Sequence, residues 1–367
     1  MTPDTVLNVF IDVNILLLVA CLVWTTALVI FPLIGLKSTF RTQLFLLNGS
    51  IGAIILCPIF VYLFSEWTSQ NSLNLSDLVV ANYLNGNFQV DAEQLESALG
   101  FREEMVREVV SLKSFAAQIL VGTFSIISAV LFSRLLYQGY RLWTQLKDSY
   151  LLKRIGNIYI LVSDEISIPY STRDLTRRYI VIPEEMLTRQ LDLKIAITHE
   201  LQHFRQKDIE WEFFLEVLKP LLFWNPVYYV WCAQVRRLRE YACDQIIVNR
   251  SPYGIRAYCE CLLRTSRSQS KSKRSNRIRL PSVALVDKCD SDKSKRSLLR
   301  KRILMMTNAH ENKGSNLVSV FASISVFGIV FTTSVLMQNP KDWSHDRLML
   351  STIINLERMN TINNVAR

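Results

Sequence analysis

Four long apolar blocks constrain this chain more than any other feature of its sequence. They cover residues 13–35, 44–64, 115–137 and 316–337. A membrane core is crossed by about 20 helical residues, and each block has that length. One such block can be a buried core helix, but four of them predict an integral membrane protein. The composition agrees, because 50% of the residues are hydrophobic and only 20% are charged, against about 25% charged in average soluble chains.

The charges between the blocks predict how the chain is oriented. Lys37 and Arg41 follow the first block, more basic residues follow the third, and the loop at 65–112 is mainly acidic. Loops rich in Lys and Arg stay on the cytosolic side of a membrane. We therefore expect the 65–112 loop to be extracytoplasmic and the segment after the third block to be cytosolic.

These assignments predict the domain organisation. Residues 1–142 form three transmembrane helices joined by their loops, and residues 143–312 form a cytosolic domain. Residues 313–338 contain the fourth transmembrane helix, and 339–367 form a short extracytoplasmic tail. The fold class expected is therefore α+β, with a cytosolic domain inserted between the third and fourth of four membrane helices.

The stretch 264–302 is strongly basic and Ser-rich in its first half. It carries fourteen Lys or Arg and three Asp, so most of the net charge of +10 lies here. We interpret it as a linker that leads through a short basic helix into the last span. A nucleic-acid site is the alternative, but no aromatic residues are interleaved to stack bases. Basic residues beside a span that contact anionic lipid explain the charge better.

Two short runs in the cytosolic part are typical of strands, and a helix follows them. Residues 157–164 and 178–183 are rich in β-branched and aromatic residues, and Pro183 ends the second run. Apolar residues spaced three or four apart then predict a helix at about 190–207 with a buried stripe.

That helix carries "HELQH", in which His199 and His203 stand four residues apart with Glu200 beside the first. Residues four apart share one face of a helix, so both imidazoles can reach one zinc ion. A bound zinc ion lowers the pKa of a water ligand toward 7, and Glu200 is placed to accept its proton. The chain has only four histidines, so this spacing predicts a zinc hydrolase.

Zinc held by two histidines needs a third protein ligand. Asn225 and Pro226 are typical of a helix start, and within the helix that follows, Glu240 and Asp244 again stand four apart. Glu240 can complete a His-His-Glu site, and Asp244 can accept the free N–H of a ligating histidine. The alternative is a solvated acidic face, paired with the nearby arginines Arg236, Arg237 and Arg239.

The apolar stretch 213–235 is long enough to suggest a fifth span. Glu216, Lys219 and the break at Asn225 and Pro226 argue against a simple crossing. We expect a helix pair beside the active site that is either buried or in contact with the membrane surface.

With these residues in view, the chain resembles the BlaR/MecR antirepressor family, bacterial membrane zinc peptidases that act as β-lactam sensor-transducers. The resemblance extends through the fourth apolar block and is carried by "YIVIP", "HELQHFRQKD", "FWNP" and "REYACD". It implies a gluzincin fold, with His199, His203 and Glu240 as ligands of one Zn²⁺ and Glu200 as general base. It also implies an edge strand on which a peptide substrate lies, formed by Tyr179, Ile180 and Val181.

The chain departs from this family after the fourth block. The antibiotic sensors continue into a large penicillin-binding domain, whereas about thirty residues follow here, too few for a domain with its own core. β-Lactam sensing by this chain is therefore doubtful.

The function expected is a zinc metalloendopeptidase of the inner membrane that cleaves a cytosolic repressor or another regulator. Self-cleavage in the basic linker is a further expectation. The alternatives are a quality-control protease for membrane proteins and a non-catalytic signal transducer. Expected partners are the protein substrate and membrane lipid, together with a second copy of the chain or a separate sensor, and not nucleic acid.

Overall fold

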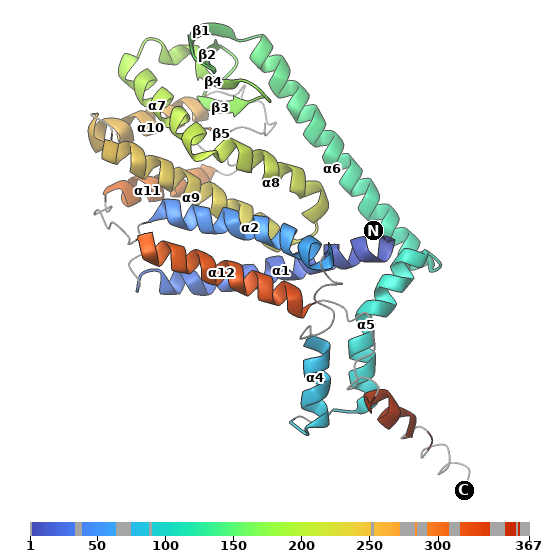
Figure 1. Cartoon of the computed structure of the whole chain (residues 1–367). Helices are drawn as coiled ribbons and strands as arrows, with labels where there is room; N and C mark the ends of the chain where they lie inside the picture. The colour runs from blue at the N-terminus through green and yellow to red at the C-terminus, as the bar shows by residue number, and fades with distance from the viewer. Residues whose placement is uncertain are drawn as a thin grey trace. The chain divides into compact units, whose positions relative to one another are not determined.

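The computed structural model describes residues 2–33, 39–63, 75–87, 90–250, 253–271, 283–284, 292–307, 316–337, 349–356 and 359. The described chain is mostly helical and has one small sheet (Figure 1). It divides into two compact units. One consists of residues 1–27, 49–125 and 320–367, and the other of residues 28–48 and 126–319.

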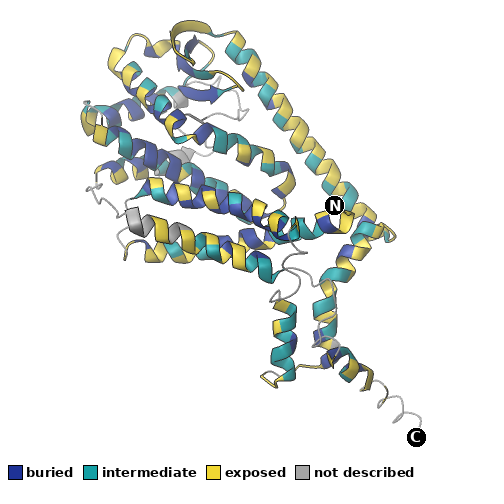
Figure 2. Cartoon of the chain, in the orientation of Figure 1, coloured by how far each residue is buried: buried dark blue, intermediate teal, exposed yellow. Residues whose placement is uncertain are grey.

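Within the described residues, three helices are long and apolar enough to cross a membrane. They are α1 (Pro3–Ile30), α2 (Phe40–Leu63) and α6 (Phe115–Lys147), which contain the first three predicted spans. Only 6% of the most apolar window of α6 is buried within the chain, against 61% for α2. Figure 2 shows this exposure along most of α6. Apolar side chains so exposed need an apolar surrounding, which a bilayer supplies.

The fourth predicted span coincides with α12 (Asn316–Leu336). Within α12, the apolar helical stretch Ile324–Leu336 is shorter than α1, α2 and α6. A four-span topology with the domain inserted before α12 therefore stays a prediction.

The predicted outer loop and tail pack together in the first unit. Val80 of α4 (Leu75–Leu84) and Leu95 of α5 (Ala92–Ser111) share a core with Leu350 and Ile354. Arg102 of α5 also pairs with Asp12 of α1 at 2.8 Å. The predicted topology places the loop and the tail on the same side of the membrane, as this shared core requires. Residues 65–74 and 88–89 of the loop, and 339–348, 357–358 and 360–367 of the tail, lie outside the described residues.

The second unit contains a five-stranded sheet of order β1-β2-β4-β3-β5. Its strands are Tyr150–Ile155, Ile158–Ser163, Tyr170–Arg173, Arg178–Pro183 and Val283–Ala284, numbered β1 to β5. Only β2 and β4 run parallel. The two predicted strands are confirmed as β2 and β4. Two strands were not predicted, namely β1, which is exposed at every residue, and β3, which reads "YSTR".

The prediction that Tyr179, Ile180 and Val181 form an edge strand is wrong. They belong to β4, which lies between β2 and β3, and Ile180 and Val181 are fully buried. Ile180 packs toward the helical core, whereas Val181 packs with Leu142 of α6 on the other face. A strand buried on both faces is apolar at consecutive positions, which explains the sequence "YIVI".

Beyond β3 the sheet ends at β5, which pairs antiparallel with β3. Ser171 lies opposite Val283, and Tyr170 lies opposite Ala284. The strand β5 also lies beside α7 and α8.

Between β4 and α12, the described residues form six helical segments, of which the first is the short η1 (Glu184–Met186). The others are α7 (Gln190–Gln206), α8 (Asp208–Leu222), α9 (Pro226–Arg250), α10 (Gly254–Lys271) and α11 (Asp292–Thr307). Ile195 of α7, Ile247 of α9 and Leu262 of α10 share a core with the sheet. The predicted cap is confirmed, because the Asn225 side chain accepts the Val227 N–H at 3.0 Å.

The basic linker begins later than predicted. Residues 264–271 complete α10, and Arg264 donates to both carboxylate oxygens of Asp192 at 3.0 and 2.8 Å. This ion pair fixes a segment that composition alone marks as irregular. The predicted short basic helix is α11, and residues 272–282 and 285–291 lie outside the described residues.

The apolar stretch 213–235 is broken into two helices, α8 and α9, rather than one continuous helix. Phe214, Val217 and Leu221 form an exposed stripe on α8, and Trp224 at the turn is 52% exposed. An exposed stripe of this kind, with an aromatic residue at its end, is typical of a helix that rests in a membrane interface.

We expect Leu221 to contact lipid. The photoreactive residue p-benzoylphenylalanine in place of Leu221 should form lipid adducts in nanodiscs, detected by mass spectrometry. The same residue in place of Leu175, which is 96% exposed in the turn before β4, serves as the control and should form none. Crosslinks from position 221 to protein instead of lipid would show that another chain covers the stripe.

Candidate metal centre

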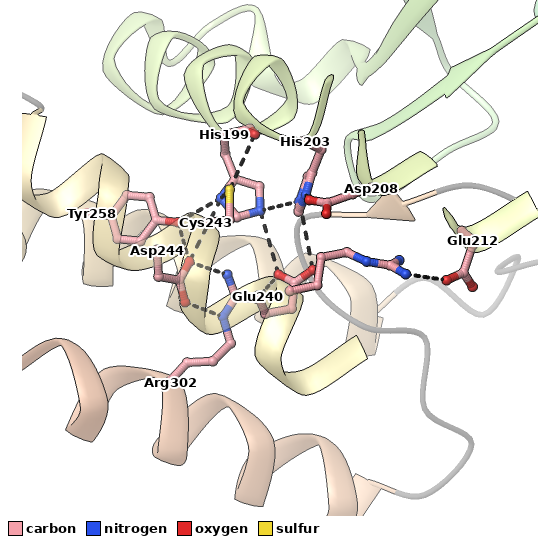
Figure 3. A network of polar contacts seen from close by, with 10 residues as sticks. His199, His203, Asp208, Glu212, Glu240, Cys243, Asp244, Tyr258 and Arg302 are labelled. Carbon is pink, nitrogen blue, oxygen red and sulfur yellow. Dashed lines mark hydrogen bonds and ion pairs between the residues drawn. The ribbon is translucent and has the colours of Figure 1, made fainter. Parts of the chain in front are cut away.

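The helix α7 directs both histidines of the "HELQH" stretch into the interior. Ile195, Ala196 and Phe204 anchor one side of this helix in the core, and His199 and His203 are completely buried. Their Nε2 atoms lie 3.1 Å apart (Figure 3). The spacing of four residues, about one helical turn, therefore brings one nitrogen of each ring to a common point.

The helix α9 brings Glu240 to the same point. Its Oε2 lies 3.6 Å from Nε2 of His199, and its Oε1 lies 3.8 Å from Nε2 of His203. A tetrahedral zinc ion with ligands at 2.0–2.1 Å separates its ligand atoms by about 3.3–3.4 Å. The three side chains therefore fit the donor set and the spacing that such an ion requires.

His203 is held by Asp208, the first residue of α8. Its Nδ1 lies 2.7 Å from Oδ2 of Asp208. Lys207 between the two helices has a φ of 59°, and this left-handed turn folds the chain back so that Asp208 reaches the ring. An N–H donated from Nδ1 to the carboxylate leaves Nε2 as the electron-pair donor.

Asp208 was not among the predicted site residues. It lies five residues after His203 in "HELQHFRQKD", within the stretch that carries the resemblance. The sequence shows that Asp208 lies close to His203 along the chain. It does not show the left-handed turn at Lys207, which brings the carboxylate into contact with the ring.

His199 is held through Tyr258 of α10. The Tyr258 hydroxyl lies 2.8 Å from Nδ1 of His199 and donates to Oδ1 of Asp244 at 2.6 Å. Asp244 itself is 3.8 Å from Nδ1 of His199. The predicted direct hydrogen bond between Asp244 and a ligand histidine is therefore wrong, because Tyr258 lies between them.

Arg302 of α11 binds the two carboxylates of α9. Its Nε and Nη2 donate to Asp244 at 2.7 Å each, and its Nη1 lies 3.0 Å from Oε2 of Glu240. Burial alone would raise the pKa of Asp244, but Arg302, followed by smaller contributions from His199 and Tyr258, lowers it below its ordinary value. The acidic pair of α9 is therefore not a solvated face, since both residues are buried and both contact Arg302.

His199 is neutral in this environment. Burial, followed by the nearby Arg302 charge, lowers the pKa of His199 to about 3. A neutral imidazole keeps the lone pair that a metal ion needs. The site therefore favours metal binding over protonation at this ring.

Cys243 is a second candidate for a third ligand. Its sulfur, with ligand atoms of His199 and His203, forms a group within 4.8 Å. The sulfur lies 3.5 Å from Nδ1 of His199, on the opposite side of the ring from Nε2. Burial, with Asp244 and Glu240 nearby, raises the pKa of the Cys243 thiol well above its ordinary value. A neutral thiol on that side of the ring is a poor ligand for the ion that both Nε2 atoms would share.

Several other residues of these helices and of the sheet lie in or near the second unit's core. Glu200 follows His199 on α7 and is completely buried. Arg239 pairs with Glu212 of α8 at 2.7 Å, and the ring of Tyr241 packs on Phe40 at 5.3 Å. Tyr179, Ile180 and Val181 lie within the sheet rather than at an open edge.

Removal of the Asp208 carboxylate should weaken metal binding. Without it, His203 loses the hydrogen bond that fixes its ring, and losses of this kind cost about 10–100-fold in affinity. We expect Asp208→Ala to weaken zinc binding by that factor in a competition assay with a chelating dye. The exposed Asp164 provides the control Asp164→Ala, which should bind zinc as the wild type does. Equal affinities for both variants would contradict a role of Asp208 in this centre.

Comparison with known proteins gives a match to a protein family. A family model described as BlaR1 peptidase M56 matches residues 51–283, which is more than half of the chain. No curated protein matches the chain. The matched region contains α7, α8, α9 and α10 but ends before α11.

Proposed function

The chain belongs to the BlaR1 peptidase M56 family, and we propose that it is a membrane-embedded zinc metallopeptidase with its active site between α7 and α9. One observation carries this proposal. Two buried imidazole Nε2 atoms lie 3.1 Å apart, and both oxygens of one carboxylate lie within 3.8 Å of them. Two neutral nitrogen donors and a carboxylate are the donor set of many catalytic zinc sites.

We assign His199, His203 and Glu240 as the ligands of one zinc ion per chain. Glu240 is preferred to Cys243 because its oxygens face Nε2 of both histidines, whereas the sulfur faces Nδ1 of His199. Asp208 and Tyr258 hold the two rings through their Nδ1 atoms.

Glu200 is the proposed general base. A bound zinc ion supplies a Lewis acid that makes water acidic near neutral pH and polarises a peptide carbonyl. The Glu200 carboxylate would accept a proton from the attacking water while the water oxygen bonds to the carbonyl carbon. The same proton would then pass to the amine nitrogen as the C–N bond breaks.

The outer edge of β3 is the proposed substrate site. Unlike β4, which lies between β2 and β3, β3 is paired on its outer side with the two-residue strand β5. A peptide that takes the place of β5 along β3 would make main-chain hydrogen bonds independent of its sequence. Its backbone would lie beside α7, as β5 does.

A cytosolic regulator, such as a repressor, is the proposed substrate, with the active site on the cytosolic side of the inner membrane. Self-cleavage is the proposed accompanying reaction. The strand β5 belongs to the predicted linker and lies on the β3 edge beside α7 and α8, which supports access of this linker to the active site.

Replacement of Glu200 should separate metal binding from catalysis. Glu200→Gln keeps the size of the side chain but removes its basicity, so zinc should remain at about one per chain. Loss of a general base lowers rates by about 10²–10⁴-fold. We expect protein N-termini that arise in cells with the wild type to be absent with Glu200→Gln, measured by N-terminal proteomics. Fragments of the chain itself should disappear with them if self-cleavage occurs.

Glu240→Gln should lose zinc, and Glu184→Gln, at an exposed position, should behave as the wild type. Wild-type protein without zinc would favour a non-catalytic transducer. Unchanged N-termini with Glu200→Gln, in a wild type that binds zinc, would exclude Glu200 as the base.

A further inference from the structure

We propose that Arg302 of α11 is a positioning residue of the metal centre, which orients Glu240 directly and His199 indirectly. The inference deepens the proposed function and rests on it, because it takes Glu240 and His199 as metal ligands. With this role of Arg302, the metal centre depends on α11, which lies outside the residues matched by the family model.

The guanidinium of Arg302 joins two carboxylates of α9. Its Nε and Nη2 donate to the two oxygens of Asp244, and its Nη1 lies 3.0 Å from Oε2 of Glu240 (Figure 3). A guanidinium is planar and presents its donors in a fixed fork, so two contacts to Asp244 set the direction of the third. Arg302 thereby restrains Glu240, whose other oxygen, Oε1, lies near Nε2 of His203.

A second path leads from Arg302 to His199. Asp244 accepts the Tyr258 hydroxyl proton at 2.6 Å. Because that proton is directed to Asp244, the Tyr258 oxygen is left to accept an N–H from Nδ1 of His199 at 2.8 Å. The series Arg302, Asp244, Tyr258 then fixes the tautomer in which Nε2 of His199 carries the lone pair.

Burial increases the energetic cost of losing these contacts. The exposed fraction of the side chain is 6% for Arg302, 1% for Asp244 and 10% for Glu240. Water is therefore largely excluded as a replacement partner, and a buried carboxylate that loses its cation is costly. Loss of Arg302 would leave Asp244 and Glu240 to repel each other and to reorient.

Two effects of Arg302 on a bound cation oppose each other. Its positive charge repels a zinc ion, so its removal would favour binding on electrostatic grounds. Its hydrogen bonds orient the ligands, so its removal would disfavour binding. We infer that orientation dominates, because Arg302 contacts one ligand directly and a second through two buried hydrogen bonds.

The packing of α11 explains how Arg302 reaches this position. Leu299, Ile303 and Met306 recur at helical spacing and join the core beneath the sheet. Arg302 lies on the same side of the helix, so docking of these apolar residues delivers the guanidinium to α9. The segment is also the last described element before α12, the predicted fourth span.

The test compares three variants of the full-length chain, purified in detergent. Arg302→Met keeps the length of the side chain without its charge, and Arg302→Lys keeps the charge without the fork. Arg300→Met is the matched control, because Arg300 is exposed on the same helix. Zinc affinity is measured by competition with a chelating dye, and the visible spectrum of the cobalt-substituted protein reports the ligand geometry.

We expect Arg302→Met to weaken zinc binding by about 10–100-fold and Arg302→Lys to weaken it by less. Both should alter the cobalt spectrum, and Arg300→Met should leave both measurements unchanged. If Arg302→Met does not fold, Arg302→Lys, which keeps a buried charge, decides the question.

Two results would overturn different parts of this account. Wild-type zinc affinity, or a higher one, in the folded Arg302 variants together with an unchanged cobalt spectrum would reduce Arg302 to a structural ion pair. Failure of the wild-type chain to bind zinc would instead overturn the proposed function, on which the role of Arg302 rests.

Discussion

The centre between α7 and α9 depends on the pairing of buried polar groups. His199, His203, Asp208, Glu240 and Asp244 are all withdrawn from water, and each would destabilise the fold without a partner. Their partners come from separate helices, since Asp208 belongs to α8, Tyr258 to α10 and Arg302 to α11. The site therefore forms only when α8, α9 and α10 pack on α7 and α11 packs on α9 and α10.

The apolar core makes that docking possible. One face of the sheet, with Ile180 and Ile182, packs against α7, and side chains of α9, α10 and α11 complete the same core. The other face packs on α6, the third candidate membrane helix, through Leu142. The scaffold of the metal centre thus continues directly into a helix able to cross a membrane (Figure 2).

Much of the secondary structure was accessible from the pattern of the residues. Helix α7 was predicted from its apolar spacing, and the start of α9 was predicted from Asn225 and Pro226. The strands β2 and β4 were predicted because they are rich in β-branched residues. β1 and β3 were missed because exposed or polar strands lack that signal. The prediction that β4 is an edge strand was wrong, because an apolar run predicts that a strand is buried but does not identify the strands that pair with it.

The sequence by itself determined which residues could form the centre. The helical period places His199 and His203 on one face, and Glu240 is one of few acids in a helix with a strong start signal. Only the tertiary structure decided how these residues are held. The contact of Asp208 with His203 depends on a left-handed turn at Lys207. Arg302 belongs to α11 and lies 62 residues after Glu240 in the sequence. Local spacing follows from backbone geometry within one element, whereas contacts between elements depend on the packing of the whole core.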